Sequence, residues 1–140
     1  MPDFFTLSIS CLISSTIILG LGGKEHWQQH INETVTLLNK APVTYLSTLQ
    51  LYLDEISENE FHDKFNEKFL PQDDQGILLE LSALISQLEP PKRIIFRSNH
   101  ASNALPLAGN LPKDKDRLLA EINNAISVPG RLTPDYLRSL

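Results

Sequence analysis

The segment "FRSNHASN", residues 96–103, places many hydrogen-bonding side chains directly behind a short apolar run. Arg97 carries a planar guanidinium that suits a carboxylate or a phosphate, and His100 can exchange a proton near neutral pH. Ligands in parallel α/β folds bind at the carboxyl ends of strands. The segment therefore predicts substrate contacts from Arg97, Asn99 and His100. The alternative is a loop whose Asn and Ser side chains bond only the local backbone.

A second candidate site is the stretch "STIILGLGGKEHW", residues 15–27, in which an apolar run ends in three glycines within four residues. A P-loop would need glycine where Ile18 stands and Ser or Thr where Glu25 stands. Glu25 also occupies the third glycine position of the dinucleotide-binding fingerprint. What remains is a glycine-rich corner between a strand and a helix, where a ligand can approach the backbone and unpaired N–H groups. The alternative is a tight turn without a ligand.

The residues that could hold a metal give a weak pattern. His26 and His30 lie four positions apart, but the zinc-protease motif needs Glu where Trp27 stands. We therefore expect a solvated helix face and no metal site. The single cysteine, Cys11, excludes an internal disulfide framework and a cysteine-only metal site made by this chain alone. A reducing, cytoplasmic location is the resulting expectation.

Composition and charge narrow the class of protein. The 140 residues suffice for one domain, and 41% hydrophobic with 21% charged residues is ordinary for a globular protein. The net charge of −5 gives no support to nucleic-acid binding. Residues 4–23 carry no charge and are long enough for a membrane anchor. Their hydroxyls, β-branched residues and glycines favour two buried strand-like pieces instead, so we expect no membrane span.

Hydrophobic periodicity predicts alternating strands and helices. The expected strands cover residues 14–19, 44–53 and 93–97. The expected helices cover 24–40, a short phenylalanine-rich segment opened by a capping box at Ser57 and Glu60, a segment from about 73 to 89, and 114–126, with a final turn after Pro134. Residues 98–112 are expected to form a non-periodic polar loop.

Alternation of strand and helix is typical of parallel strands joined by right-handed crossovers. Three parallel strands make a poor independent sheet, because parallel sheets need cover on both faces. The chain is therefore expected to be an α/β protein that forms part of a larger barrel or doubly wound sheet.

Three segments in this order carry a family resemblance: "SSTIILGLGGKEHWQQHINETVTLLN", "TYLSTLQLYL" and "FRSNHASNALPLAGNLPKDKDRLL". They resemble the C-terminal part of the catalytic barrel, and its extension, in one group of radical S-adenosylmethionine (radical SAM) proteins. The resemblance covers residues 13–126. Its most specific part is "RSNHASN" followed by LPL-x-G-x-LP-x-D.

The resemblance implies an incomplete (β/α)6-type barrel in which Ser14–Leu19 is the fifth strand and residues 44–53 the sixth. In the complete family protein a CxxxCxxC loop holds a [4Fe–4S] cluster, which reduces S-adenosylmethionine to generate a radical. The family's fifth-strand motif, GxIxGxxE, falls on "TIILGLGG", where Ile18 and Gly20 match and Gly23 replaces the glutamate. Because this motif packs against adenine, the implied cofactor contacts are Ile18, Gly20, Gly22, Gly23 and Leu51.

The chain departs from the family in having no CxxxCxxC. We therefore expect a C-terminal fragment of a radical SAM iron–sulfur enzyme, inactive alone, to which neither S-adenosylmethionine nor a cluster binds stably. The expected division is an unmatched leader (1–12), the last barrel elements (13–89), an extension (90–126) and a tail (127–140). Expected partners are a small-molecule substrate, a second copy or a missing N-terminal half. The alternatives are a non-catalytic α/β partner-binding domain and a protein anchored in a membrane through residues 4–23.

Overall fold

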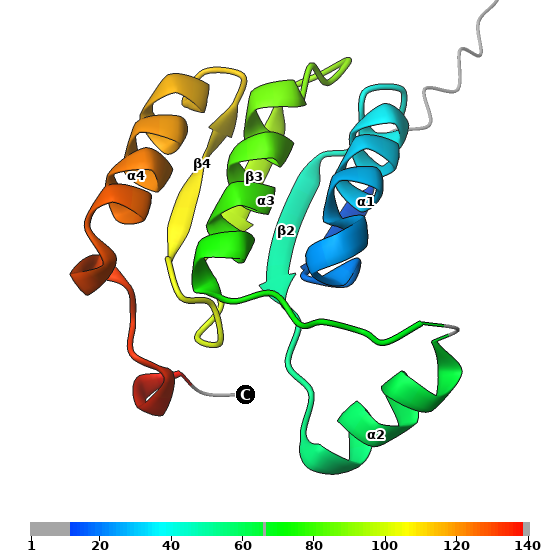
Figure 1. Cartoon of the computed structure of the whole chain (residues 1–140). Coiled ribbons are helices and arrows are strands. Elements are labelled where there is room, and N and C mark those ends of the chain that lie inside the picture. Colours follow the sequence, from blue (N-terminus) through cyan, green and yellow to red (C-terminus); the bar gives the residue numbers. More distant parts are fainter. Residues whose placement is uncertain (1–11, 66, 139–140) are drawn as a thin grey trace, which may run out of the picture.

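Four strands form one mixed sheet in the computed structural model, which describes residues 12–65 and 67–138 (Figure 1). The strand order is β1-β2-β3-β4; β1, β2 and β3 are parallel and β4 is antiparallel to β3. The strands are β1 (Ser14–Leu19), β2 (Tyr45–Gln50), β3 (Ile94–Ser98) and β4 (Leu107–Leu111). The α/β class is confirmed, and the three expected strands are parallel.

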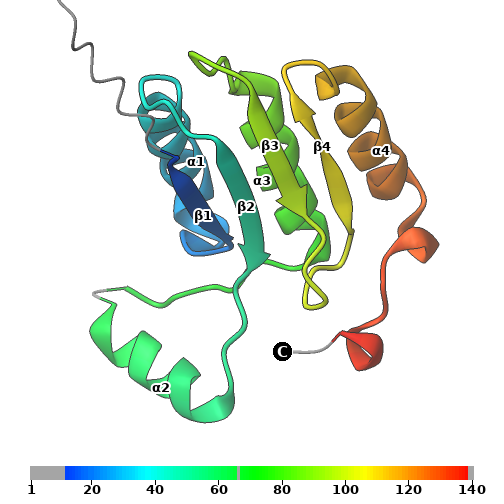
Figure 2. The same ribbon diagram turned by 180° about the vertical axis from the view of Figure 1, so that it is seen from behind.

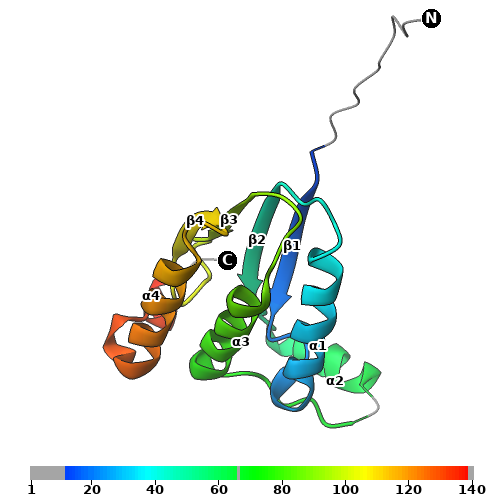
Figure 3. The same cartoon turned by 90° about the horizontal axis from the view of Figure 1, so that it is seen from above.

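Three helices cover a single face of this sheet, as the view from above shows (Figure 3). They are α1 (Gly23–Leu38), α3 (Asp74–Gln87) and α4 (Lys115–Ser127). Seen from behind, the strands lie in front of the helices and no helix of the described residues crosses them (Figure 2). We call this uncovered side the open face; it carries the alternate strand residues Ser14, Thr16, Ile18, Tyr45, Ser47, Leu49, Ile95, Arg97, Ala108 and Asn110.

The core lies between the sheet and these helices. On α1 the apolar stripe of Ile31, Val35 and Leu38 is buried, as its spacing of three and four residues predicts. On β3 the alternate residues Ile94 and Phe96 point into the same layer. The apolar side chains of the helices pack against those of the strands, and this packing holds the helices on one face of the sheet.

The prediction of a loop over residues 98–112 was wrong, because β4 lies within it. Its burial alternates, with Leu107, Gly109 and Leu111 buried, but Gly, Asn and two flanking prolines hide the pattern in the sequence. Pairing with β3, from Ile94 opposite Leu111 onward, stabilises the strand despite its poor local propensity. Pairing of β3 with β2 places the predicted extension and the predicted barrel elements in one sheet.

The second strand is shorter than expected. β2 ends at Gln50, whose backbone N–H donates to the side chain of Asn103 over 2.9 Å rather than to β3. Leu51 still donates to the carbonyl of Leu19 over 2.8 Å, but the chain then leaves the sheet toward α2 (Glu55–Lys64). Leu51 and Leu53 therefore lie beyond the sheet edge instead of within a strand.

The predicted capping box of α2 was also wrong. Asp54 caps this helix by accepting the N–H of Ser57 over 2.7 Å. The helix ends at Lys64, so Phe69 lies outside it, yet its ring returns to pack edge-on against Phe61 with centroids 4.7 Å apart. None of the ten described residues of α2 is buried, and the helix stands apart beyond the end of β2 (Figure 1).

The expectation of no membrane span concerns residues 4–23, of which 4–11 lie outside the described part. Ser14–Leu19 is a strand hydrogen-bonded to β2, so an anchor helix through residue 23 is excluded. Over the ranges 12–65 and 67–138, no helix combines the length and apolar character required to cross a bilayer.

Gly23→Ala is expected to destabilise the chain by about 2 kcal/mol. Gly23 has φ of +61°, and an added Cβ would lie 2.7 Å from the carbonyl oxygen of Leu70 and 2.8 Å from the Phe69 ring. Gly130→Ala is the matched control, because a Cβ there meets nothing within 4 Å. Urea unfolding of both variants measures the difference, and equal midpoints would contradict the close packing at Gly23.

Candidate functional site

A cavity of about 240 Å³ opens at the carboxyl ends of β1 and β2. One wall comes from the strand ends and the opposite wall from the segment that connects β2 to α3. The lining residues are Gly20, Leu51, Leu53, Glu58, Pro71, Gln72 and Ile77. A mostly apolar lining with a few polar groups is typical of a small-molecule site, and the volume is below the roughly 300–1,000 Å³ of a site for a drug-sized ligand.

Beneath this cavity lies the buried carboxyl group of Glu80, whose exposed fraction is 0%. One oxygen accepts the backbone N–H of Gly20 over 2.8 Å, and the other accepts Nε2 of Gln72 over 2.9 Å. Glu80 on α3 thereby ties the end of β1 to the cavity wall. This role was not predicted, because a glutamate among the apolar residues of a helix matches no known motif.

Three backbone N–H groups of the glycine corner are paired within the protein. Gly20 donates to Glu80, Gly23 to the carbonyl of Gly20 over 3.0 Å, and Lys24 to the carbonyl of Leu70 over 2.8 Å. These three donors are therefore not available to a ligand at this corner.

The five predicted cofactor contacts fall into three places. Gly20 and Leu51 line the cavity together. Ile18 lies on the open face, in register with Leu49 on β2. Gly22 and Gly23 border a small hollow under the loop that carries Phe69. Of the five, only Gly20 and Leu51 therefore line the cavity at the strand ends.

The three predicted substrate contacts do lie together. Arg97, Asn99 and His100 border a hollow of about 550 Å³ on the open face. We call it the open-face hollow; its other lining residues are Thr16, Ser47, Thr48, Leu49 and Ala101. The hollow and the cavity share none of the residues that line them.

The remaining polar residues of "RSNHASN" have a structural role. The Nδ2 group of Asn103 donates to the carbonyls of Thr48 and Ser98 over 2.9 and 3.1 Å, while its Oδ1 accepts the N–H of Gln50. The hydroxyl of Thr48 donates to that of Ser98 over 2.6 Å. Asn103 therefore clamps the ends of β2 and β3 where their backbone pairing stops. The interpretation as a locally bonded loop is confirmed for Asn103 and Ser98. Arg97, Asn99 and His100 are exposed, and their role as substrate contacts stays a prediction.

No family model, curated protein or solved structure matches the chain. The radical SAM resemblance therefore rests on the sequence segments quoted above.

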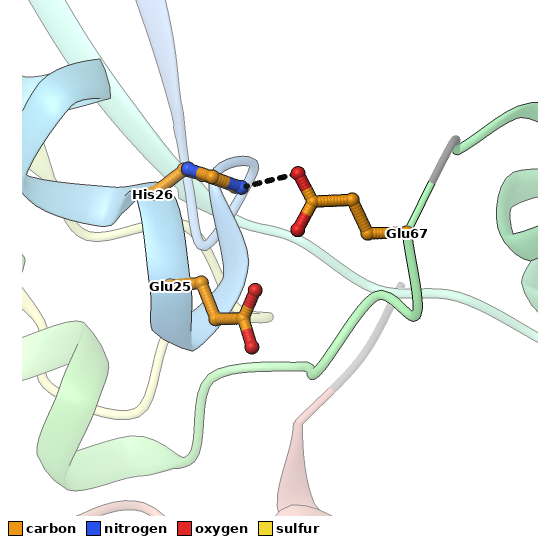
Figure 4. Close-up of side chains that lie close together, drawn as sticks. All are labelled: Glu25, His26 and Glu67. Atoms are coloured by element: carbon orange, nitrogen blue, oxygen red, sulfur yellow. Dashed lines mark ion pairs between the residues drawn. The ribbon is translucent and has the colours of Figure 1, made fainter.

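The described part of the chain contains one cluster with metal-binding side chains, formed by Glu25, His26 and Glu67 (Figure 4). The Nε2 atom of His26 lies 3.6 Å from a carboxylate oxygen of Glu67. All three side chains are exposed. Two belong to the first turn of α1, where the helix dipole repels cations. His30 is not part of this cluster, so the two histidines four positions apart do not form a shared metal-binding group in the described residues.

The C-terminal segment is fixed across the same sheet edge by Arg138, which the sequence analysis did not single out. Its Nη1 and Nη2 atoms donate to the two carboxylate oxygens of Asp74 over 3.0 and 2.7 Å. Asp74 begins α3 and also accepts Nε2 of Gln50. The pair joins the chain end to α3 and borders a second opening of about 380 Å³ beside Tyr52 and Ser102.

Acid is expected to break this attachment. The hydrogen bonds from Arg138 hold the pKa of Asp74 below its ordinary value. The stabilisation is therefore complete above the unfolded pKa of about 3.9 and is lost as the pH falls through the lower folded pKa. Asp74→Asn should lower the free energy of unfolding by about 1 kcal/mol at neutral pH, since the pair is partly exposed. It should also reduce the loss of stability below about pH 4.

Asp116→Asn is the control, because Asp116 lies in the first turn of α4 without an ion pair in the described residues. Chemical unfolding at a series of pH values measures both variants. A pH profile of Asp74→Asn that parallels the wild-type profile would contradict the role of the pair.

Proposed function

We propose that this chain is the C-terminal part of a radical SAM iron–sulfur enzyme. In this proposal it supplies the adenine side of the S-adenosylmethionine site and part of the substrate pocket, and it is inactive alone. The observation that carries the proposal is the one-sided cover of the sheet. Parallel sheets normally have both faces covered, whereas here α1, α3 and α4 cover one face and the other bears Thr16, Ser47 and Arg97.

A barrel accounts for this arrangement, because its strands carry helices outside and enclose ligands or side chains inside. The open face then corresponds to the inner wall. Ligand contacts in such folds come from the carboxyl ends of the strands. The cavity beside Gly20 and Leu51 lies at this end. The open-face hollow reaches it at Asn99 and His100, which follow β3.

The two cofactors fit the chain to different degrees. The apolar cavity at Gly20, Leu51 and Ile77 suits a flat adenine ring. A [4Fe–4S] cluster does not fit, because its family loop supplies three cysteines and the chain has only Cys11. The radical-generating step therefore belongs to residues outside these 140, and no part of it is assigned to this chain.

Titration with 5′-deoxyadenosine tests the adenine site. We expect saturable chemical-shift changes of the amides of Gly20, Leu51 and Ile77 at millimolar ligand, and no comparable response to uridine. Leu51→Asp should abolish the response, because it places a charge in the cavity wall. Leu21→Asp is the control, since Leu21 is exposed and does not line the cavity. A folded wild-type chain without localised shift changes would overturn the proposal.

A second candidate function, a non-catalytic partner-binding domain, is favoured by the outer edge of β1. In the described residues β1 pairs only with β2, so its other side presents backbone donors and acceptors to a partner strand. Light scattering after size-exclusion chromatography distinguishes the two candidates in part. A monomer that unfolds cooperatively and ignores 5′-deoxyadenosine would favour the self-sufficient domain over the enzyme part.

A further inference from the structure

The open-face hollow is built on one row of residues across three strands. Strand register places Thr16 opposite Ser47 and Ser47 opposite Arg97. The hydroxyls of Thr16 and Ser47 are hydrogen-bonded over 2.8 Å. Neighbouring strands are about 4.8 Å apart, so the row spans about 10 Å. Ala108 follows Arg97 on β4 and leaves room beside the guanidinium.

The charge of the hollow is opposite to that of the chain. The sequence has 17 acidic and 12 basic residues, excluding histidine. Yet of the described residues that line the hollow none is acidic, while Arg97 and His100 both border it. The strand positions of the open face likewise contain no Asp or Glu. A concave surface with basic side chains and no acidic ones attracts an anion, even in a protein of net negative charge.

Arg97 is held in place through one of its guanidinium nitrogen atoms, and its other N–H donors are available to a ligand. Its Nη1 atom donates to the carbonyl of Phe96 over 2.8 Å and lies 3.4 Å from that of Gly109. Within the described part of the chain, Arg97 forms no ion pair, and its Nε and Nη2 atoms have no hydrogen-bond partner. A guanidinium presents several N–H donors in a fixed fork that matches the two oxygens of a carboxylate or phosphate.

His100 closes the hollow beyond the end of β3. Its Nδ1 atom lies 2.7 Å from the hydroxyl of Ser102 and accepts the N–H of Ser102 over 3.2 Å. These contacts orient the ring and leave Nε2 as its free atom among the described residues. An Nε2–H can therefore donate to a bound oxygen, in addition to Arg97 and Ser47.

We infer that the open-face hollow binds the carboxylate or phosphate group of a small molecule, with Arg97 as the charged ligand and Ser47 and His100 as further hydrogen-bond donors. Its volume of about 550 Å³ suits a ligand of ordinary metabolite size. This inference extends the proposed function. Only the interpretation of the bound molecule as the substrate rests on that function.

The test uses inorganic phosphate and succinate as separate probes of the 140-residue chain at constant ionic strength. We expect saturable chemical-shift changes of the amides of Ser47, Arg97 and His100 with at least one probe. Arg97→Gln should weaken this binding about tenfold or more, because charge-assisted hydrogen bonds to one group are lost. Arg97→Lys should recover part of the affinity, since it keeps the charge without the fork.

Arg93→Gln is the charge-matched control, because Arg93 is an exposed arginine four residues earlier that does not line the hollow. Equal weakening by Arg93→Gln and Arg97→Gln would overturn the inference, as would the absence of localised shifts with both probes. Ser47→Ala gives an independent readout and should also weaken binding. Arg97→Gln should leave 5′-deoxyadenosine binding at Gly20 and Leu51 unchanged, so the failure of either site is seen separately.

Discussion

Replacing Glu80 with alanine should lower the free energy of unfolding by about 3 kcal/mol. The change removes the acceptor of two donors, the backbone N–H of Gly20 and the side-chain amide of Gln72. Because the Glu80 site is fully buried, both donors would be left there without a partner. Each buried donor without a partner costs about 1–3 kcal/mol. Urea unfolding measures the stability change. Hydrogen exchange of the Gly20 amide should accelerate more than exchange in α4.

Glu80→Gln is the matched variant for this prediction. The introduced amide keeps the size and one acceptor, and the amide of Gln72 can rotate to accept in its turn. We expect about half the loss of the alanine variant or less. If glutamine and alanine destabilise equally, the hydrogen bonds of Glu80 are not the source of its contribution.

Asn103→Ala is expected to have a comparable effect, again about 3 kcal/mol. The Asn103 side chain accepts from Gln50 and donates to the carbonyls of Thr48 and Ser98, and its exposed fraction is 6%. Without it, β2 and β3 lose the group that joins them beyond their last backbone pair, Ser47 with Arg97.

Asn99→Ala provides the comparison, because Asn99 has the same side chain in the same segment but is exposed. We expect its free energy of unfolding, measured in urea, to remain within about 0.5 kcal/mol of wild type. Similar destabilisation by both substitutions would argue against a clamp at Asn103. The pair also separates the structural half of "RSNHASN" from the half that borders the open-face hollow.

Much of the framework could be predicted because it depends on local periodicity. Burial of Ile31 and Val35 on α1 and of Ile94 and Phe96 on β3 follows the periods of 3.6 and 2. The order of alternating elements correctly predicted three parallel strands. β4 was missed because prolines, glycine and asparagine mask a strand that only its pairing with β3 stabilises.

The candidate sites were predicted less completely, since identical residue types took different roles. Nothing in the sequence distinguishes Asn99 from Asn103, yet one is exposed and the other buried in a network with Thr48 and Ser98. The glycine corner was recognised, but the protein itself occupies its backbone donors through Glu80 and Leu70.

The sequence by itself determined the class of fold, the core faces of the helices and the placement of Arg97 and His100 around the end of a strand, because these depend on residues a few positions apart. The tertiary structure decided which residues meet across 60 positions between Gly20 and Glu80, and across 64 between Asp74 and Arg138. It also decided that the helices of the described residues cover one face of the sheet, while the other face carries Thr16, Ser47 and Arg97 in a row. These outcomes depend on chain crossovers and strand register, which bring distant residues together through burial and pairing rather than through local spacing.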